Sequence, residues 1–266
     1  MEAFAPGSVT GIFAPPEPEE RRTRSRGASF ATRAGVIASV QSAGATRVTL
    51  GGEPTDFEPV VRVLDRLGLT ARVDLERSIP IGAGFGASGA ATLGTALAAN
   101  AEFDLGRDRE ELLADAHKAE VAAGTGLGDV FIQEAGGLRW STGDGMASTT
   151  PADRVEYVSY GSIPTNEVLG DATALNHIRE FGTRALEALP SQPSMPQFTA
   201  QAWSFAEQTG LVTDRVRETV ERVEAAGGAA SMSMLGETVF AVGVTDELPN
   251  ATAVDPKGAR LFEDDA

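Results

Sequence analysis

A glycine-dense stretch over residues 80–92, with the sequence PIGAGFGASGAAT, constrains the fold of this chain more than any other segment. Residues 70–78 before it alternate apolar and polar side chains, as a half-buried strand does. Residues 90–99 after it are rich in alanine and leucine and contain no β-branched run, which predicts a buried helix. The stretch is therefore expected to join a strand to a helix that begins at about residues 87–88.

A junction of this kind is suited to binding anions. The N–H groups of the first helical turn have no intrahelical partner, and the helix dipole adds about half a positive charge there. Gly82, Gly84 and Gly86 carry no Cβ atom, so a polyphosphate can approach the backbone closely. The hydroxyl of Ser88 follows at a place where a phosphate-bound Mg²⁺ could use it.

Other interpretations of the same loop are weaker. A P-loop requires Gly-Lys-Ser/Thr, and no lysine lies near the stretch, so this motif is excluded. Gly84, Gly86 and Gly89 match the dinucleotide motif G-x-G-x-x-G, but the preceding strand alternates and Pro80 intervenes. A glycine- and alanine-rich turn that only packs a helix on a sheet also stays open.

The composition favours a globular protein of one large core or, more readily, two domains. The chain has 266 residues, 42% of them hydrophobic, and no apolar run approaches the length of a membrane span. The first residues lack the basic and apolar regions of a signal peptide, so we expect a cytoplasmic protein with no membrane partner. The absence of cysteine excludes disulfides and thiolate metal sites, and two histidines leave little room for histidine-based chemistry.

The charge balance is strongly acidic. A net charge of −16 argues against non-specific binding of nucleic acid. Lys118 and Lys257 are the only lysines, so nearly all positive charge is arginine. Acidic excess with few lysines resembles the cytosolic proteins of salt-accumulating halophiles, in which most carboxylates form a solvated surface.

The N-terminal third is expected to be rich in strands. Residues 3–13 predict two short strands around a turn at Pro6 and Gly7. Residues 14–27 predict a loop that is either a solvated hairpin tip or a lid that brings a cation to an anionic substrate. The loop carries four arginines, Arg21, Arg22, Arg24 and Arg26. Residues 29–40 and 47–50 predict a pair of strands.

Two capped helices and a second glycine turn are expected next. Asp56 is expected to cap a helix that ends at Gly68, and Asp108 a helix that runs to about residue 123. The second helix carries His117, interpreted as a packed or surface residue, and Glu120. Residues 124–130 form a glycine-dense turn that contains Asp129, and residues 138–141 predict a strand.

A domain boundary near residue 150 divides the chain into domains 1–150 and 151–266. The second domain is expected to begin with a strand over 154–160, followed by one or two short helices over 165–189 that break near Gly182. Residues 196–208 and 213–226 predict amphipathic helices, the latter with three valines facing inward. Residues 227–242 predict a hairpin.

The glycine stretch resembles the motif Pro-x-x-x-Gly-Leu-Gly-Ser-Ser-Ala-Ala of the GHMP kinases, a family that includes galactokinase, homoserine kinase and mevalonate kinase. Matching residues are Pro80, Gly84, Gly86, Ser88 and Ala90, with Phe85, Ala87 and Gly89 as replacements. The resemblance implies an α/β (α+β) fold of two domains. The N-terminal domain would be like ribosomal protein S5 domain 2, and the C-terminal domain ferredoxin-like.

The resemblance also implies roles for individual residues. ATP would be bound by Pro80, Gly82, Gly84, Phe85, Gly86, Ala87, Ser88 and Gly89. Mg²⁺ would be held by Ser88 and Glu120, and Asp129 would be the catalytic residue near the acceptor hydroxyl. The substrate would meet Asp129, Ser8 and Thr10 of the first motif, Arg33, and Gly236 of a third, glycine-containing motif. The arginines 21–26 are further candidates for binding a substrate carboxylate.

Four segments together are similar to the archaeal branch of the family that acts on pantoate: PGSVTGIF, PIGAGFGASGAATLG, EVAAGTGLGDV and SMSMLGETVFAV. That branch phosphorylates the 4-hydroxyl of (R)-pantoate on the route to coenzyme A. Kinases of the same family for homoserine, shikimate or mevalonate are the alternatives, and a catalytically inactive nucleotide-binding module is another. The sequence leaves open whether the chain forms a homodimer.

Overall fold

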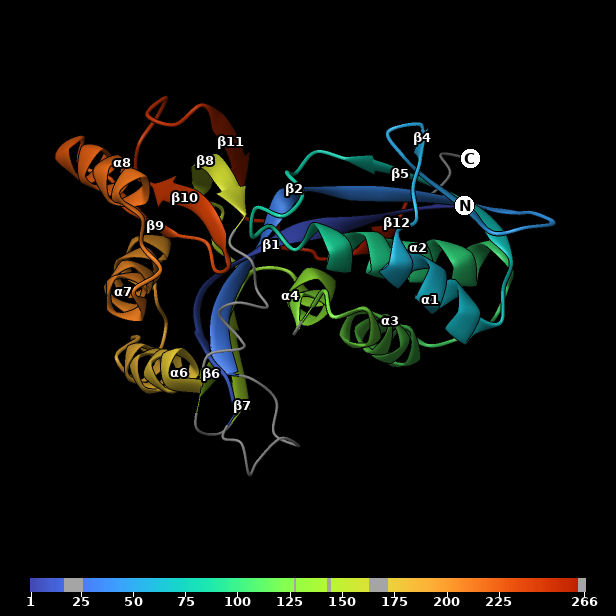
Figure 1. Cartoon of the computed structure of the whole chain (residues 1–266), viewed down its shortest axis with the longest axis horizontal. Helices are drawn as coiled ribbons and strands as arrows, with labels where there is room; N and C mark the ends of the chain where they lie inside the picture. The colour runs from blue at the N-terminus through green and yellow to red at the C-terminus, as the bar shows by residue number, and fades with distance from the viewer. Residues whose placement is uncertain (17–25, 127, 143–144, 163–171, 263–266) are drawn as a thin grey trace.

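The computed structural model describes residues 1–16, 26–126, 128–142, 145–162 and 172–262 (Figure 1). Within these residues, eight strands form a mixed sheet in the order β12-β1-β2-β5-β3-β4, with the β6–β7 hairpin joined to β2. The strands are β1 (Glu2–Ala14), β2 (Arg26–Ser42), β3 (Arg47–Leu50), β4 (Glu53–Pro54), β5 (Ala71–Arg77), β6 (Leu138–Thr142), β7 (Gly145–Thr149) and β12 (Arg260–Leu261). Four helices lie on one side of this sheet: α1 (Glu58–Leu67), α2 (Ala87–Glu102), α3 (Arg109–Ala123) and α4 (Asp129–Ala135). α2 and α4 contact its strands directly, and α1 and α3 pack against α2.

A second, antiparallel sheet has the order β11-β8-β10-β9 in the described chain. Its outer face is covered by helices, which lie at the left of Figure 1. The strands are β8 (Arg154–Ser162), β9 (Ala229–Met232), β10 (Gly236–Val242) and β11 (Asn250–Ala253); the helices that cover them are α7 (Met195–Thr209) and α8 (Asp214–Ala225). The third helix at this end, α6 (Ala172–Glu187), packs against α7 and β1. The two-layer α/β architecture with an antiparallel second sheet confirms the predicted fold class.

The N-terminal strand is continuous, so the predicted turn at Pro6 and Gly7 is wrong. β1 pairs with β2 along its whole length, and the register shifts between these two residues. The partner of Pro6 is Gly35 and the partner of Gly7 is Thr32, so β2 accommodates the extra residues. Proline has no N–H group to donate to a neighbouring strand, and a bulge is a position where regular pairing is interrupted, so proline is tolerated there.

The predicted pairing of residues 29–40 with 47–50 is also wrong. β5 lies between β2 and β3, antiparallel to β2 and parallel to β3. The segment from β3 to β5 contains α1, and a helical crossover is the connection that parallel neighbours require. Sequence order alone does not reveal this exchange of neighbours.

The ends of α1 and α3 are set by capping residues and by proline. α3 has the predicted cap at Asp108, whose side chain accepts from the Glu111 backbone. The Glu111 side chain also reaches back to the Asp108 backbone, which completes a capping box. α1 ends at Gly68 in the left-handed region, as predicted. Its N-cap is Phe57 rather than Asp56, and no side chain caps it, so that prediction is wrong; proline in the first turn fixes the start instead.

α6 runs unbroken through Gly182, against the expectation of a break there. A Cβ atom at Gly182 would collide with the backbone of Phe13 in β1, so glycine allows the helix to approach the strand closely. α7 and α8 confirm the two predicted amphipathic helices, and β9 and β10 form the predicted hairpin.

The two sheets share one apolar core. The ring of Phe30 in β2 lies 5.9 Å from Phe198 of α7 and 5.4 Å from Phe240 of β10. The chain leaves the first sheet after β7 and returns to it at β12, which pairs with β1. A division at residue 150 remains a prediction. In the described part of the chain no helix is both long and apolar enough to cross a membrane.

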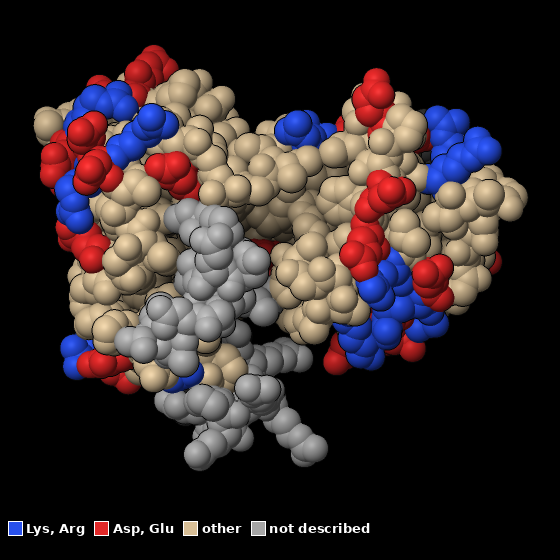
Figure 2. Space-filling view, in the orientation of Figure 1, with Lys and Arg blue, Asp and Glu red and all other residues tan. Residues whose placement is uncertain are grey.

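Charged side chains of both signs gather at the two ends of the face shown in Figure 2, and the described surface between them is mainly uncharged. A ligand that binds between the two ends of this face would therefore meet mainly uncharged groups.

Candidate functional site

The glycine loop joins β5 to α2, as the sequence predicts. Gly82, Gly84 and Gly86 have φ values of 69°, 77° and 60°. Side-chain-bearing L-residues rarely adopt this left-handed region, so each position favours glycine. A Cβ atom on Gly84 would lie 2.6 Å from Ser233 Oγ, and one on Gly86 would lie 2.7 Å from Gln133 Nε2. The loop is thus packed against α4 beside the first sheet and against the segment that follows β9 of the second sheet.

The N-terminus of α2 has the properties of an anion site. Gly86 is the N-cap, no side chain caps the helix, and the first turn holds no acidic residue. The N–H groups of Ala87, Ser88 and Gly89 are the donors that a helix start leaves without an intrahelical partner. The glycine backbone beside them gives a phosphate close access, so these residues fit a polyphosphate.

Glu120 lies beside this helix start and is surrounded by hydroxyl groups. Ser88 Oγ donates to Glu120 Oε1 at 2.9 Å and Thr92 Oγ1 donates to the same oxygen at 2.5 Å. Thr125 Oγ1 donates to Glu120 Oε2 at 2.9 Å. Burial raises the pKa of Glu120, and the hydroxyl bonds act in the opposite direction. The side chain is 2% exposed, so its charge depends on these partners.

The few protein oxygens here fit a metal ion that is held mainly by the phosphates of a bound molecule and by water. No group of three or more histidine or acidic residues able to hold a metal occurs among the described residues. Mg²⁺ commonly takes one or two protein oxygens and completes its octahedron with phosphate oxygens and water. Ser88 and Glu120, with oxygens 2.9 Å apart, offer such a pair.

A second acidic residue, Asp129, is the first residue of α4 and contacts the N-terminal strand. Ser8 Oγ donates to Asp129 Oδ1 at 2.8 Å, and the Ser8 N–H donates to the carbonyl of Phe85 at 2.9 Å. Burial raises the pKa of Asp129, while the hydrogen bond from Ser8 lowers it. The structure therefore places Asp129 next to the glycine loop, with Ser8 bonded to both.

Gln133, which lies one turn after Asp129 in α4, was not among the residues predicted from the sequence. Gln133 Nε2 donates to the carbonyl of Gly86 at 2.7 Å and lies 3.4 Å from Ser8 Oγ. The i, i+4 spacing from Asp129 puts both side chains on one helix face and was the signal available. This spacing was not used in the prediction, because residues 131–135 were not expected to be helical.

A polar row crosses the sheet next to Ser8. Thr10 and Ser29 are partners in the β1–β2 register, and their hydroxyl oxygens lie 2.9 Å apart. Ser29 is in turn the partner of Arg139 in β6. Ser8 and Thr10 are two residues apart in a regular part of β1, so the row lies on the sheet face that carries Ser8.

Arg139, which the sequence analysis did not consider, is the cation of this row. It is half-buried and donates to the backbone carbonyls of Gly136 and Ala135 at 3.1 and 3.4 Å. Its planar group retains donors for a carboxylate.

The expected arginines lie elsewhere. Arg33 is exposed in β2, and within the described chain no hydrogen bond joins it to Ser8 or Asp129. Arg26 donates to Thr183 of α6 at 2.7 Å. Arg21, Arg22 and Arg24 fall outside the described residues, so the predicted lid cannot be placed.

The remaining predicted residues surround the glycine loop. Gly236 packs against the backbone of Ala83, where a Cβ atom would lie 2.5 Å from the carbonyl oxygen. Phe85 is buried with its ring 4.7 Å from that of Tyr157, so its side chain belongs to the core and its backbone to the loop. Pro80 is half-buried at the entry of the loop. His117, as predicted, is packed, with its ring 4.9 Å from that of Phe131.

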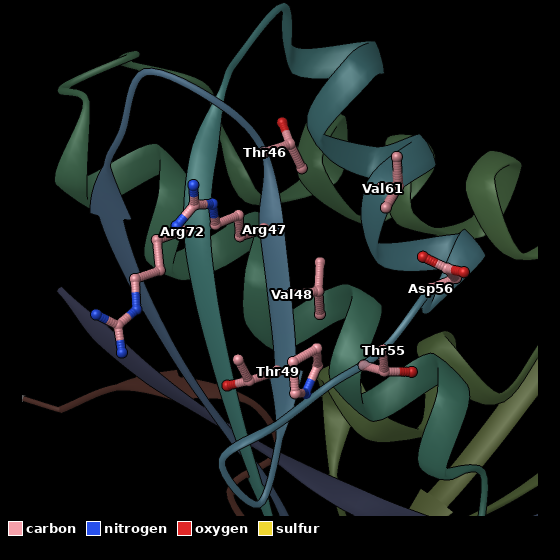
Figure 3. A pocket seen from close by; sticks show the side chains of 9 residues that line it. Thr46, Arg47, Val48, Thr49, Thr55, Asp56, Val61 and Arg72 are labelled. Atoms are coloured by element: carbon pink, nitrogen blue, oxygen red, sulfur yellow. The ribbon is translucent and has the colours of Figure 1, made fainter.

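A hollow of about 630 Å³ lies away from these residues, between β3 and the start of α1 (Figure 3). Arg47 and Arg72, partners in the β3–β5 register, extend to one side of it in this view, and Asp56 and Val61 lie on the other. Arg72 is paired with Asp74 at 2.8 Å. No predicted site residue lines the hollow.

Several known proteins are similar to this chain in sequence or in structure. Residues 57–137 match the model of the GHMP kinases N terminal domain. A pantoate kinase of Thermococcus kodakarensis is 31% identical, with 93% of this chain and 88% of the relative covered. A pantoate kinase of Methanocaldococcus jannaschii is 28% identical, with 94% and 96% covered. A solved structure described as a phosphotransferase related to the CoA biosynthesis pathway superposes with a TM-score of 0.84 at 27% identity, over 98% of both chains.

Proposed function

We propose, from the premise that this chain belongs to the pantoate kinase family of GHMP kinases, that it transfers the γ-phosphoryl group of ATP to the 4-hydroxyl of (R)-pantoate. One structural observation carries the proposal. Gly86, the N-cap of α2, faces the acid of α4, and a Cβ atom on it would lie 3.2 Å from Asp129 Cγ. A helix start suited to anions and a half-buried carboxylate are adjacent, as phosphoryl transfer to a hydroxyl requires.

The nucleotide would be held mainly by backbone groups. The helix start and loop fit the phosphates, and ATP supplies the transferable group when it is bound. The residues proposed for this task are Pro80, Gly82, Gly84, Phe85, Gly86, Ala87, Ser88 and Gly89. Because Phe85 is buried, its part is limited to the backbone, whose carbonyl is bonded to Ser8.

Ser88 and Glu120 would hold Mg²⁺. Their oxygens are already adjacent, and Thr92 and Thr125 orient the carboxylate by hydrogen bonds to its two oxygens. A metal ion would offset the cost of keeping this carboxylate charged in its buried surroundings. Charge neutralisation of the phosphates is the chemistry that the ion would supply.

Asp129 would accept a hydrogen bond from the acceptor hydroxyl and take its proton. The raised pKa of this half-buried carboxyl makes it a better proton acceptor when ionised than an ordinary aspartate. Its bond to Ser8 fixes one oxygen and orients the carboxylate. Orientation of the hydroxyl and acceptance of its proton both follow from this placement.

The acceptor would occupy the sheet face beside Ser8 and Thr10, with Gly236 behind the glycine loop. Pantoate carries a carboxylate, which requires a cation, and two hydroxyl groups, which require polar partners. Arg139 belongs to the row of Thr10 and Ser29 and is the arginine best placed for the carboxylate. Arg33, which the sequence favoured, is exposed, and among the described residues no hydrogen bond joins it to this row, so we retain it as the second candidate.

The working environment proposed for this protein is a cytoplasm rich in salt. The net charge of −16 with two lysines carries this proposal. Screening relieves self-repulsion of a highly charged surface, so the melting temperature should rise from low to molar KCl. A melting temperature that is flat or falls over that range would remove the basis for a halophilic source.

An acceptor panel tests the function. ADP formation from Mg·ATP would be followed in molar KCl with pantoate, homoserine, shikimate or mevalonate, and without acceptor. We expect ADP formation to depend on pantoate. Dependence on another acceptor would retain the kinase and change its substrate, whereas no acceptor dependence at all would favour a nucleotide-binding module without transferase activity.

A further inference from the structure

Gln133 stands out among buried polar residues because its side chain connects the two halves of the site. It is fully buried in α4, and its Nε2 donates to the carbonyl of Gly86 at 2.7 Å. That carbonyl also accepts the N–H of Ala90 at 3.0 Å, the first bond of α2. The amide thus contacts the start of the phosphate-binding helix itself.

The same amide contacts the acceptor half. Nε2 lies 3.4 Å from Ser8 Oγ, and Ser8 donates its one hydroxyl proton to Asp129 at 2.8 Å. An N–H group directed at the serine oxygen favours this direction of the Ser8 proton, since Ser8 then accepts from Gln133 and donates to Asp129. The orientation of the amide is fixed, because the opposite one would place two acceptors, Oε1 and the Gly86 carbonyl, 2.7 Å apart.

The oxygen of the Gln133 amide lowers the stability of the fold. Gln133 Oε1 is buried and has no hydrogen-bond partner in the part of the chain that the structure describes. It faces α2 so closely that a Cβ atom on Gly89 would lie 2.7 Å from it. An unpaired buried acceptor destabilises a protein, so packing alone would favour an apolar residue here.

We propose that Gln133 is a positioning residue, which keeps the Ser8–Asp129 pair in register with the phosphate-binding start of α2. This inference rests on the proposed kinase function. In it, Gln133 touches neither substrate. Loss of the amide lets α4 and Ser8 shift relative to Gly86, so the acceptor hydroxyl is misaligned with the phosphoryl group while the phosphates still bind.

The test compares Gln133→Met, which keeps the length and removes both polar atoms, with Gln133→Glu, which keeps the shape and places an acceptor opposite the Gly86 carbonyl. Thr199→Val is the matched control, because Thr199 is also fully buried and loses one bond, 2.8 Å to the carbonyl of Met195 in α7, a helix that carries none of the proposed site residues. The measurements are kcat, KM for each substrate, the ratio of ADP to phosphorylated acceptor, the Kd of ADP by calorimetry, and the melting temperature.

We expect both Gln133 variants to lower kcat by about 10-fold or more, the scale of a small misplacement of reacting groups. The ratio of ADP to phosphorylated acceptor should rise above the wild-type ratio, because water competes with a misaligned hydroxyl. The Kd of ADP should stay within about 2-fold, and Gln133→Met should melt close to wild type because the unpaired acceptor is removed too. Thr199→Val should retain the wild-type kcat and ratio.

Wild-type kcat and ratio in both variants would overturn the inference. The inference would also be overturned if Thr199→Val lost kcat as much as the Gln133 variants do for the same drop in melting temperature. Failure of both Gln133 variants to fold would overturn it too. Either result assigns Gln133 to stability alone. If only Gln133→Met fails to fold, Gln133→Glu decides by the same criteria. A wild-type enzyme that phosphorylates another acceptor of the panel would change the proposed substrate, and the ratio would then be measured with that acceptor.

Discussion

Ser8 Oγ lies 2.8 Å from Asp129 Oδ1, and this bond joins the N-terminal strand to a helix 121 residues later. The Ser8 backbone is at the same time bonded to the carbonyl of Phe85 in the glycine loop. One residue therefore fixes the distance between the carboxylate and the loop. In the proposed reaction these are the proton acceptor and the phosphate-binding element.

Asp129→Asn should lower kcat by about 100-fold or more, which is the scale of general acid–base contributions. The amide keeps the size of the side chain but cannot take a proton. The KM for ATP should change little, because the phosphates are assigned to the loop and the start of α2. Steady-state kinetics with both substrates varied make the comparison. Collapse of ATP affinity with kcat preserved would instead assign Asp129 to the nucleotide site.

Ser8→Ala should move the acidic limb of the kcat–pH profile to higher pH. Burial raises the pKa of Asp129 and the bond from Ser8 lowers it, so removal of the hydroxyl leaves the raising effect less opposed. The ionised form is the active base, so activity rises with pH through this pKa in both enzymes, and later in the variant. The profile would be measured from below the ordinary pKa of an aspartate up to the pH at which kcat no longer rises. A limb that stays in place or moves to lower pH would show that Asp129 does not control it.

Ser88→Ala and Glu120→Gln should each weaken the use of Mg·ATP and leave the fold intact. The two oxygens are 2.9 Å apart and form the only metal pair assigned in the described chain. Activity would be titrated with Mg²⁺ at constant ATP, with circular dichroism as the control for folding. Near wild-type activity of both variants at limiting Mg²⁺ would remove these residues from the metal site.

Arg139→Met should raise the KM for pantoate far more than the KM for ATP. The guanidinium lies in the row of Thr10 and Ser29, and a carboxylate can form two parallel hydrogen bonds with it. Arg33→Met is the matched comparison, since Arg33 is exposed in β2. Arg139→Lys, which keeps the charge without the planar fork, should fall between wild type and Arg139→Met. If Arg33→Met shows the larger KM effect, the carboxylate belongs to Arg33.

The elements that depend on residues close together in the sequence were predicted correctly. The strand, glycine loop and α2 followed from periodicity and from the residues that a left-handed backbone accepts. The cap of α3 followed from Asp108, and the buried face of α8 from its valines. The predicted acids, Glu120 and Asp129, do lie beside the loop in the structure.

The failures depend on contacts between distant segments. β5 comes between β2 and β3 because of a helical crossover, which strand propensity does not encode. Gly182 serves a close approach to β1 rather than a helix break, and only the packed structure distinguishes these two uses of glycine. Gln133 and Arg139 escaped notice for the same reason, since their importance comes from the atoms that α4 and β6 place around them.

The position of the transferred phosphate tests the central claim most directly. Wild-type enzyme would convert (R)-pantoate and ATP in molar KCl, and ³¹P and ¹³C NMR would identify the phosphorylated carbon of the product while ADP is quantified in the same sample. The account predicts one phosphate ester, on the 4-hydroxyl, formed in a one-to-one ratio with ADP. ADP formed without any phosphorylated pantoate, or an ester on the 2-hydroxyl, would contradict it.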